Sequence, residues 1–379
     1  MKLIRLFLLF LLVSLILSPM GFAESPQNFQ DFLNQWRTQN HITSVVIGIE
    51  DLKSNQIQTY QSGGLLVNTS QAPTMNSLYG VGSISKTFVS ATLLQLQEEG
   101  KINLDKPIGP YFPEYPRWKL ITIRQLLNMS AGIYNFTESS EFEKLERSNP
   151  KTIIPPKNLI DMAYAHPNYF APGRGWHYSN TNYFLAALII EKITHESLAQ
   201  NYQERFFKPL NLSHSFYSES FYPKVVLTQM AHAYANHQDI TDFNAGLPGA
   251  AGAMLMSTGD LLTWTEDLFT PGKVLDQKSL NEFLTTVGVP NMSPRPEGSQ
   301  YGLGVFWTKF KDKNSGPSWW YTGVITGYTS IFMFIPAEHK IITAQVATYP
   351  DNNYAVLFPN QDLVKKLLEL PSHNVKQEI

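Results

Sequence analysis

The apolar residues of this chain recur at helical spacing in some segments and gather in short strand-like runs between turn residues in others. One amphipathic helix is predicted over residues 27–39, and a second over residues 83–99, which Gly100 would end. Strands are predicted near both ends of the chain, over residues 45–50, 56–61, 328–334 and 341–349. A last helix is predicted over residues 361–370.

The middle of the chain has a mostly helical pattern, interrupted by loops rich in proline and aromatic residues. Thr122 begins a capping-box pattern there, and Ser257 begins a similar helix start further on. Because strands stand at both ends, we expect one α/β sandwich domain built from residues 24–120 and 250–379. Residues 121–249 would form a helical domain inserted into it.

The first 23 residues have the pattern of a secretory signal peptide. Lys2 and Arg5 precede an apolar run over residues 6–17, and small residues at Gly21 and Ala23 predict cleavage after Ala23. The alternative is an uncleaved membrane anchor, but the run is short for a bilayer, which needs about 20 residues. We therefore expect export to the bacterial periplasm or the medium.

The amino-acid composition and net charge exclude several classes of function. The chain has 379 residues, of which 43% are hydrophobic, so it can bury a core. The formal net charge of −2 gives no electrostatic basis for binding nucleic acid. Cysteine is absent, which excludes disulfides, thiolate nucleophiles and cysteine-based metal sites. The histidines show no H-E-x-x-H spacing, so no metal site is predicted.

The strongest chemical signal is the pair Ser83 and Lys86. A spacing of three places both side chains on one face of a helix. A serine hydroxyl becomes a good nucleophile when a neighbouring base takes its proton, and a buried lysine of lowered pKa can be that base. The alternative is a capping serine beside a solvated lysine.

Two further segments carry weaker signals. Tyr178 and Asn180 lie on a loop before a helix, where a tyrosine hydroxyl could exchange protons and an amide could bind substrate. Residues 321–324 are placed at the start of a strand, where Gly323 would let a ligand backbone approach and Val324 N–H could face a substrate carbonyl. Taken singly, each segment is better explained as an ordinary turn.

Together and in this order, the three segments resemble the serine β-lactamase and D-Ala-D-Ala peptidase superfamily. The resemblance is greatest to the branch with class C β-lactamases, secreted DD-peptidases and family VIII esterases. It extends over essentially the whole mature chain, with family-like blocks at residues 79–86, 121–127, 172–183, 249–260 and 301–304. It implies an α/β fold with an antiparallel sheet flanked by helices, a mostly helical inserted domain, and an active site between the two.

The resemblance also implies roles for individual residues. Ser83 matches the acylated nucleophile, Lys86 the adjacent base, and Tyr178 the residue that relays protons to the leaving group. Asn180 matches a residue that binds the substrate's amide, and the backbone N–H groups of Ser83 and Val324 match the oxyanion hole. The third motif, which contributes to substrate binding, corresponds to Tyr321, Thr322 and Gly323. No metal or organic cofactor is implied.

One position departs from the pattern. The third motif of the family usually begins with lysine or histidine, and here Tyr321 stands in that place. A neutral hydroxyl holds a substrate carboxylate less strongly than a cation does. The change could favour esters, amides or internal peptide bonds. Arg174 could supply a charge instead, although a surface role is favoured for it.

The sequence therefore predicts an exported serine hydrolase that forms an acyl-enzyme on Ser83. The favoured substrate is a peptidoglycan-type D-amino-acid peptide, as for a DD-carboxypeptidase. β-Lactamase and carboxylesterase activities are the alternatives within this class, and a non-catalytic binding protein on the same fold is the alternative outside it. The expected partner is a small molecule or peptide. Peripheral membrane association and the oligomeric state stay open.

Overall fold

The computed structural model describes residues 26–67, 69–148, 151–235, 238–291, 296–310, 316–348 and 361–370. The predicted signal peptide, residues 1–23, lies outside these described residues. Within them, no helix combines the length and the apolar character that crossing a membrane requires.

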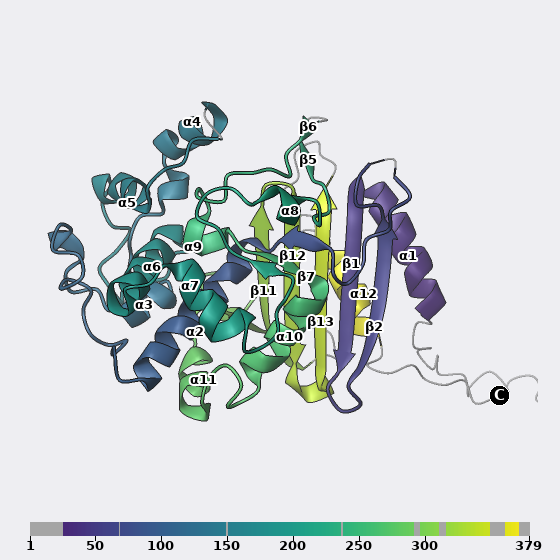
Figure 1. The fold of residues 1–379 in the computed structure, drawn as a ribbon. Coiled ribbons are helices and arrows are strands. Elements are labelled where there is room, and N and C mark those ends of the chain that lie inside the picture. The colour runs from purple at the N-terminus through teal and green to yellow at the C-terminus, as the bar shows by residue number, and fades with distance from the viewer. Residues whose placement is uncertain are drawn as a thin grey trace, which may run out of the picture.

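An antiparallel sheet of eight strands forms the centre of the fold (Figure 1), in the order β2-β1-β13-β12-β11-β10-β9-β8. Its strands are β1 (Ile42–Asp51), β2 (Gln56–Gly63), β8 (Val287–Gly288), β9 (Gln300–Tyr301), β10 (Phe306–Lys309), β11 (Pro317–Ile325), β12 (Tyr328–Ile335) and β13 (Lys340–Thr348). The pairing of β1 with β13 joins the two ends of the chain. This confirms the α/β class with an antiparallel sheet flanked by helices.

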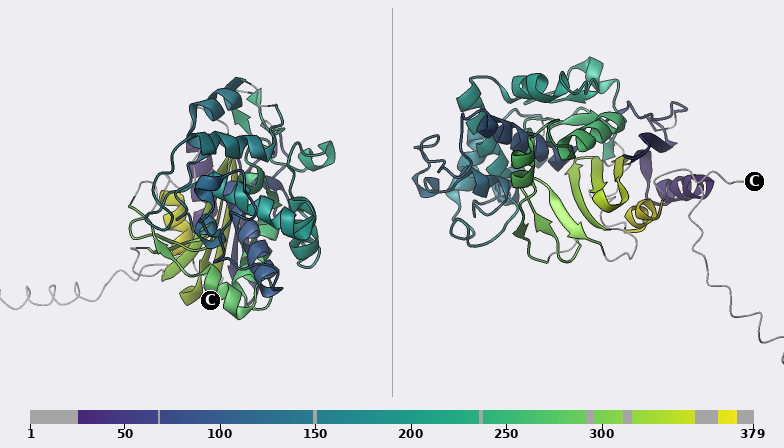
Figure 2. Two further views of the ribbon diagram at one scale, coloured as in Figure 1. Left: turned by 90° about the vertical axis from the view of Figure 1, so that its left-hand side faces the viewer. Right: turned by 90° about the horizontal axis from the view of Figure 1, so that it is seen from below.

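Helices cover both faces of the sheet, which explains why β1 and β13 are buried along their whole length. Helices α1 (Pro26–Gln39) and α12 (Gln361–Glu369) lie on one face, and α10 (Thr258–Phe269) lies on the other (Figure 2). Phe29 of α1 packs edge-on against Tyr60 of β2. On the opposite face, Gly48 leaves room for Leu262 of α10, because a Cβ there would lie 2.7 Å from Leu262 Cδ1.

Most of the remaining elements lie beside the sheet, towards the left in Figure 1. The helices are α2 (Ser85–Glu98), α3 (Ile123–Leu127), α4 (Ser140–Ser148), α5 (Pro156–Ala165), α6 (Asn180–Thr194), α7 (Leu198–Tyr202), α8 (Lys224–Leu227), α9 (Gly249–Gly252) and α11 (Gln277–Phe283). The 3₁₀ and π turns are η1 (Gly82–Ile84), η2 (Pro116–Trp118), η3 (Phe136–Glu138), η4 (Gln203–Phe207) and η5 (Pro336–Glu338). The short strands are β3 (Leu78–Gly80), β4 (Ser215–Phe216), β5 (Tyr234–Ala235), β6 (Gln238–Asp239) and β7 (Leu255–Ser257). The division into two domains at residues 121 and 249 stays a prediction.

Both predicted helix starts are confirmed. The Thr122 hydroxyl accepts a hydrogen bond from Gln125 N, and the Gln125 side chain accepts one from Thr122 N, which completes a capping box. Ser257 Oγ accepts from Asp260 N at 3.1 Å at the start of α10. Both motifs are local, so the sequence contained everything needed to form them.

Two predicted placements were wrong. Ser83 does not lie within the helix: it occupies the 3₁₀ turn η1, and α2 begins at Ser85. Tyr321 lies in the middle of β11, not at the start of a strand. The strand begins earlier because Trp320 pairs with Phe306 of β10 on one side and with Met333 of β12 on the other. These pairings are tertiary, so the local pattern did not contain them.

Candidate active site

A tight turn presents Ser83 in front of helix α2. The turn depends on Gly82, whose φ is +49°, a left-handed conformation that favours glycine. A Cβ on Gly82 would lie 2.6 Å from the backbone nitrogen of Val324 on β11. Ser85 Oγ closes the turn by donating to Gly82 O at 2.7 Å. The serine is therefore held by the conformation of Gly82 and by the hydrogen bond from Ser85, not by helical geometry alone.

Strand β11 packs directly against this turn. A Cβ on Gly323 would lie 1.7 Å from Val81 O and 2.9 Å from Ser83 N, a clash that no other residue avoids. Gly323 is thus required by the turn beside it, a reason for glycine that the sequence did not reveal, and its predicted role in substrate binding stays a prediction. The close approach brings the backbone of Val324 next to that of Ser83, the pair expected to form the oxyanion hole.

Lys86 lies one helical turn beyond Ser83 and is fully buried. Its Nζ donates to Ser83 Oγ at 3.1 Å and to Ala251 O at 2.7 Å, so the ammonium is aimed at the hydroxyl. Burial lowers the pKa of Lys86, although the charge and the hydrogen bond of Tyr178 act in the opposite direction. A lysine of lowered pKa in contact with a serine can serve as its base.

Tyr178 completes the cluster from the loop before α6. Its Oη donates to Ser83 Oγ at 2.7 Å, and Lys86 Nζ lies 4.9 Å from the centre of its ring. Burial by itself would raise the pKa of Tyr178. The positive charge and hydrogen bond of Lys86, with hydrogen bonds from Ser83 and Tyr321, outweigh this effect and lower it. The structure thus brings the three predicted catalytic residues into mutual contact.

The third motif lies behind Tyr178. Tyr321 is only 1% exposed, and its Oη lies 3.3 Å from Tyr178 Oη and 2.9 Å from Tyr301 Oη. The hydroxyl of Thr322 is buried and makes no hydrogen bond to any residue of the described segments. Val324 is 38% exposed, so the end of β11 meets solvent beside Ser83. Tyr321 therefore faces Tyr178, not open space.

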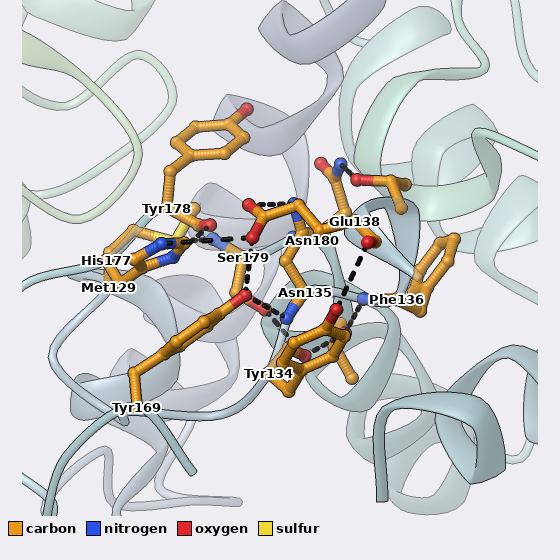
Figure 3. A network of polar contacts seen from close by, with 12 residues as sticks. Met129, Tyr134, Asn135, Phe136, Glu138, Tyr169, His177, Tyr178, Ser179 and Asn180 are labelled. Carbon is orange, nitrogen blue, oxygen red and sulfur yellow. Dashed lines mark hydrogen bonds and ion pairs between the residues drawn. The ribbon is translucent and has the colours of Figure 1, made fainter. Parts of the chain in front are cut away.

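Asn180, the first residue of α6, lies on a polar network beside the cluster (Figure 3). Its backbone N donates to Asn135 Oδ1 at 3.0 Å, and its Nδ2 donates to Thr137 Oγ1 at 3.3 Å. Arg174, the alternative source of positive charge, is exposed, and none of the cluster's described contacts involves it.

Three residues that the sequence did not single out as site residues form a group on the same network, here called the Glu138 group: Glu138, Tyr169 and His177. Tyr169 Oη donates to Glu138 Oε2 at 2.7 Å, and Asn135 Nδ2 donates to Glu138 Oε1 at 3.1 Å (Figure 3). His177 Nε2 lies 4.0 Å from Glu138 Oε2, and its ring stacks on Tyr169 at 3.7 Å. The carboxylate is held by neutral donors while its side chain stays 45% exposed.

Little in the sequence could have revealed this group. Glu138 lies in a short polar segment with no periodicity, and only the fold brings η3 beside residues 169–180. Tyr301 was detectable in part, because it begins one of the family-like blocks.

The fold and the Ser83–Lys86–Tyr178 cluster define the class of protein: a serine hydrolase on an antiparallel α/β scaffold. A model of the family described as "Beta-lactamase" matches residues 29–363, so the chain belongs to the β-lactamase family.

Known proteins similar to this chain include three of interest. The "Putative penicillin-binding protein PbpX" of Bacillus subtilis is 27% identical over 270 residues, which are 71% of this chain and 61% of that protein. The "Teichoic acid D-alanine hydrolase" of Staphylococcus aureus (strain MRSA252) is 31% identical over 155 residues, which are 40% of this chain and 36% of that protein. This chain thus spans less than two thirds of the length of these relatives.

A solved structure matches over more of its length. The D-stereospecific amidohydrolase from a Streptomyces species superposes with a TM-score of 0.73 at 30% sequence identity. The match covers 84% of this chain and 93% of that one.

Proposed function

We propose that this protein is an exported hydrolase of D-amino-acid amides, peptides and esters that works through an acyl-enzyme on Ser83. The observation that carries the proposal is the contact of Ser83 Oγ with both Lys86 Nζ, at 3.1 Å, and Tyr178 Oη, at 2.7 Å. The names of similar proteins, a D-stereospecific amidohydrolase and a teichoic acid D-alanine hydrolase, support a D-amino-acid substrate.

The geometry suits acyl transfer in two steps. Ser83 Oγ attacks the substrate carbonyl carbon, and its proton passes to the Lys86–Tyr178 pair. Backbone N–H groups of Ser83 and Val324 hold the oxyanion. The C–N or C–O bond then breaks, and the pair returns the proton to the leaving amine or alcohol. Water adds to the acyl carbon, and the acid leaves as the Ser83 hydroxyl is restored.

The charges at the site favour a substrate whose acyl part carries a free ammonium group. The Glu138 carboxylate is 45% exposed, and within the described segments no lysine or arginine forms an ion pair with it. An ammonium group there would gain a charge-assisted hydrogen bond. Tyr321, in contrast, gives a substrate carboxylate no positive charge and almost no exposed surface.

A second candidate is the DD-carboxypeptidase activity that the sequence favours. Its specific support is the similarity to a protein named as penicillin-binding. Such a substrate ends in a free carboxylate and has an acylated amine, so it presents the opposite charges to the site. The proposal therefore predicts substrates with a free amine, whereas the carboxypeptidase predicts substrates with an acylated amine and a free carboxylate.

A small panel of substrates separates them. We would compare kcat/KM for D-alanine p-nitroanilide, its N-acetyl derivative, L-alanine p-nitroanilide and an N-acylated D-alanyl-D-alanine peptide. The proposal predicts preference for the free D-amine, and no turnover by Ser83→Ala. Preference for the acylated dipeptide would support the carboxypeptidase instead. Preference for the L-compound would contradict both.

The site must also become acylated. Intact-mass measurement over time with a penicillin would detect an adduct on Ser83. A lasting adduct indicates a penicillin-binding site, and hydrolysis of the drug without an adduct indicates a β-lactamase. Export, which we propose from the pattern of residues 1–23, is tested by the N-terminus of protein recovered from a periplasmic fraction.

A further inference from the structure

Behind the catalytic cluster, three tyrosine hydroxyls form a chain. Tyr178 Oη, which contacts Ser83 Oγ, lies 3.3 Å from Tyr321 Oη, and Tyr321 Oη lies 2.9 Å from Tyr301 Oη. Each hydroxyl has one proton to donate and can accept in return. The chain therefore leads from the reacting hydroxyl of Ser83 into the core.

The inner two tyrosines are fixed by packing. Both are almost completely buried, and Phe306 contacts both rings, at centroid distances of 4.6 Å from Tyr301 and 5.5 Å from Tyr321. Trp176 packs edge-on against Tyr301 at 5.7 Å. With 1% of its surface exposed, Tyr321 presents almost nothing for a substrate to touch. The Tyr321 hydroxyl instead contacts the hydroxyl of Tyr178, so it can change how readily Tyr178 loses its proton.

The three tyrosines differ in how readily they lose a proton. Burial raises the pKa of Tyr321 well above its ordinary value, and the charges of Tyr178 and Tyr183 raise it further. Burial likewise raises the pKa of Tyr301. The pKa of Tyr178 is shifted in the opposite direction by Lys86 and by its hydrogen bonds. The inner hydroxyls thus stay protonated and act as donors when Tyr178 becomes negatively charged.

We propose that Tyr321 is a positioning residue, whose hydroxyl, oriented by Tyr301, donates a hydrogen bond to the Tyr178 phenolate and so keeps Tyr178 in its proton-accepting form at lower pH. The inference rests on the acyl-serine chemistry of the proposed function but not on the substrate. The family pattern usually has a lysine or histidine at this position. Here the neutral hydroxyl of Tyr321 takes the place of that side chain. No proton leaves Tyr321 or Tyr301, so the proton taken from Ser83 stays on the Lys86–Tyr178 pair.

The sign of the pH effect follows from this arrangement. The titratable groups around the Tyr178 phenol come from several elements: Lys86 of α2, Tyr183 of α6, Tyr301 of β9, Tyr321 of β11 and the adjacent His177. Removing the Tyr321 donor destabilises the phenolate, which raises the pKa of the pair. The proton-accepting form then exists only at higher pH, so the ascending limb of the kcat–pH profile moves towards alkaline pH.

The test compares the wild type with Tyr321→Phe and Tyr301→Phe. With p-nitrophenyl acetate, Tyr321→Phe should lower kcat about tenfold, leave KM within about twofold, and move the ascending limb about one pH unit higher. Tyr301→Phe should act in the same direction by about threefold, because it touches Tyr178 only through Tyr321. The control is Tyr115→Phe, which removes a buried hydroxyl that donates to Asp161 at 2.7 Å, and it should leave the profile unchanged.

A readout that needs no turnover accompanies these rates. Ultraviolet difference titration should show one early-titrating tyrosine that Tyr178→Phe removes, that Tyr321→Phe moves to higher pH and that Tyr321→Lys moves to lower pH. A fall in kcat without a shift of that tyrosine would reduce Tyr321 to a structural role and overturn the inference. A rise in KM confined to carboxylate substrates would make Tyr321 a substrate-binding residue and overturn it too. If the wild type shows the titration but forms no acyl-Ser83, the proposed function fails and the positioning of Tyr178 stands.

Discussion

The two sides of the Ser83–Lys86–Tyr178 cluster differ in charge and in exposure to solvent. On the solvent side, the Glu138 group combines a partly exposed carboxylate with a hydroxyl and an imidazole. On the core side, Tyr321 and Tyr301 offer only neutral hydroxyls within aromatic packing. A charge with no partner is expensive to bury, whereas a hydroxyl that finds another hydroxyl is not. We therefore propose that the solvent side selects substrate and that the core side adjusts the proton chemistry.

Lys86, the buried lysine of the cluster, should give the largest effect. Lys86→Met keeps roughly the length of the side chain but removes the amine that contacts Ser83 Oγ and interacts with Tyr178, so the proton-accepting pair loses one member. We expect kcat to fall by about three to four orders of magnitude on every substrate, as measured by single-turnover acylation.

The matched control is Lys340, another deeply buried lysine. Its Nζ donates to Leu370 O at 3.0 Å, next to α12. Lys340→Met should lower the melting temperature and leave kcat unchanged. Wild-type acylation by Lys86→Met would show that the cluster does not depend on a lysine base.

Gly323→Ala should give the next largest effect, because the added methyl group would push strand β11, which carries Tyr321, away from the Ser83 turn. A Cβ at 1.7 Å from Val81 O must displace backbone, which misplaces the N–H groups of Ser83 and Val324. Loss of an oxyanion donor typically lowers kcat about 100- to 1,000-fold. We expect a fall of that size, together with a lower melting temperature in calorimetry.

Gly288→Ala provides the control, since a Cβ on this glycine of β8 meets nothing within 4 Å. It should change neither quantity. If Gly323→Ala kept the wild-type kcat, the close approach of β11 to the Ser83 turn would not be needed for catalysis.

Glu138→Gln tests the solvent side alone. The amide keeps the shape of the side chain but loses its negative charge, so a substrate ammonium loses a charge-assisted hydrogen bond. We expect kcat/KM to fall about tenfold for D-alanine p-nitroanilide and to stay unchanged for its N-acetyl derivative. Glu141→Gln, at an exposed position in the first turn of α4, is the control. Equal losses on both substrates would remove Glu138 from substrate selection.

The smallest effect is expected from Tyr169→Phe. The ring keeps its stacking on His177, but Glu138 loses the donor that orients it at 2.7 Å. One neutral hydrogen bond of this kind corresponds to a loss of about threefold to tenfold in kcat/KM for the free amine. In the Glu138→Gln background the same change should have almost no effect. Additive losses in the double variant would mean that Tyr169 acts independently of Glu138.

Much of the scaffold was predictable because its signals are local or periodic. Capping at Thr122 and Ser257 involves residues three apart, and the strands that became β1, β2, β12 and β13 are short runs joined by turn-forming residues at 53–55 and 336–339. Boundaries set by pairing were less predictable, as the early start of β11 shows.

The candidate site divides in the same way. Ser83 and Lys86 are three residues apart, so their contact was expected from spacing, although they meet across a 3₁₀ turn and not within a helix. Tyr178 and Tyr321 were recognised only through a resemblance spread along the whole chain. The Glu138 group has neither a period nor a motif, and its members come together only because η3 folds against the loop before α6.

By itself, the sequence determined the types of side chain available for the chemistry, the α/β class and the helix caps, because each depends on residues near one another in the chain. Tertiary structure decided what Tyr321 contacts. Nothing local determines whether a tyrosine in a strand faces substrate or core, because that depends on which strand pairs beside it and which turn packs against it. Here the pairing of β11 with β10 and β12, and the bare backbone of Gly82 and Gly323, placed its hydroxyl between Tyr178 and Tyr301.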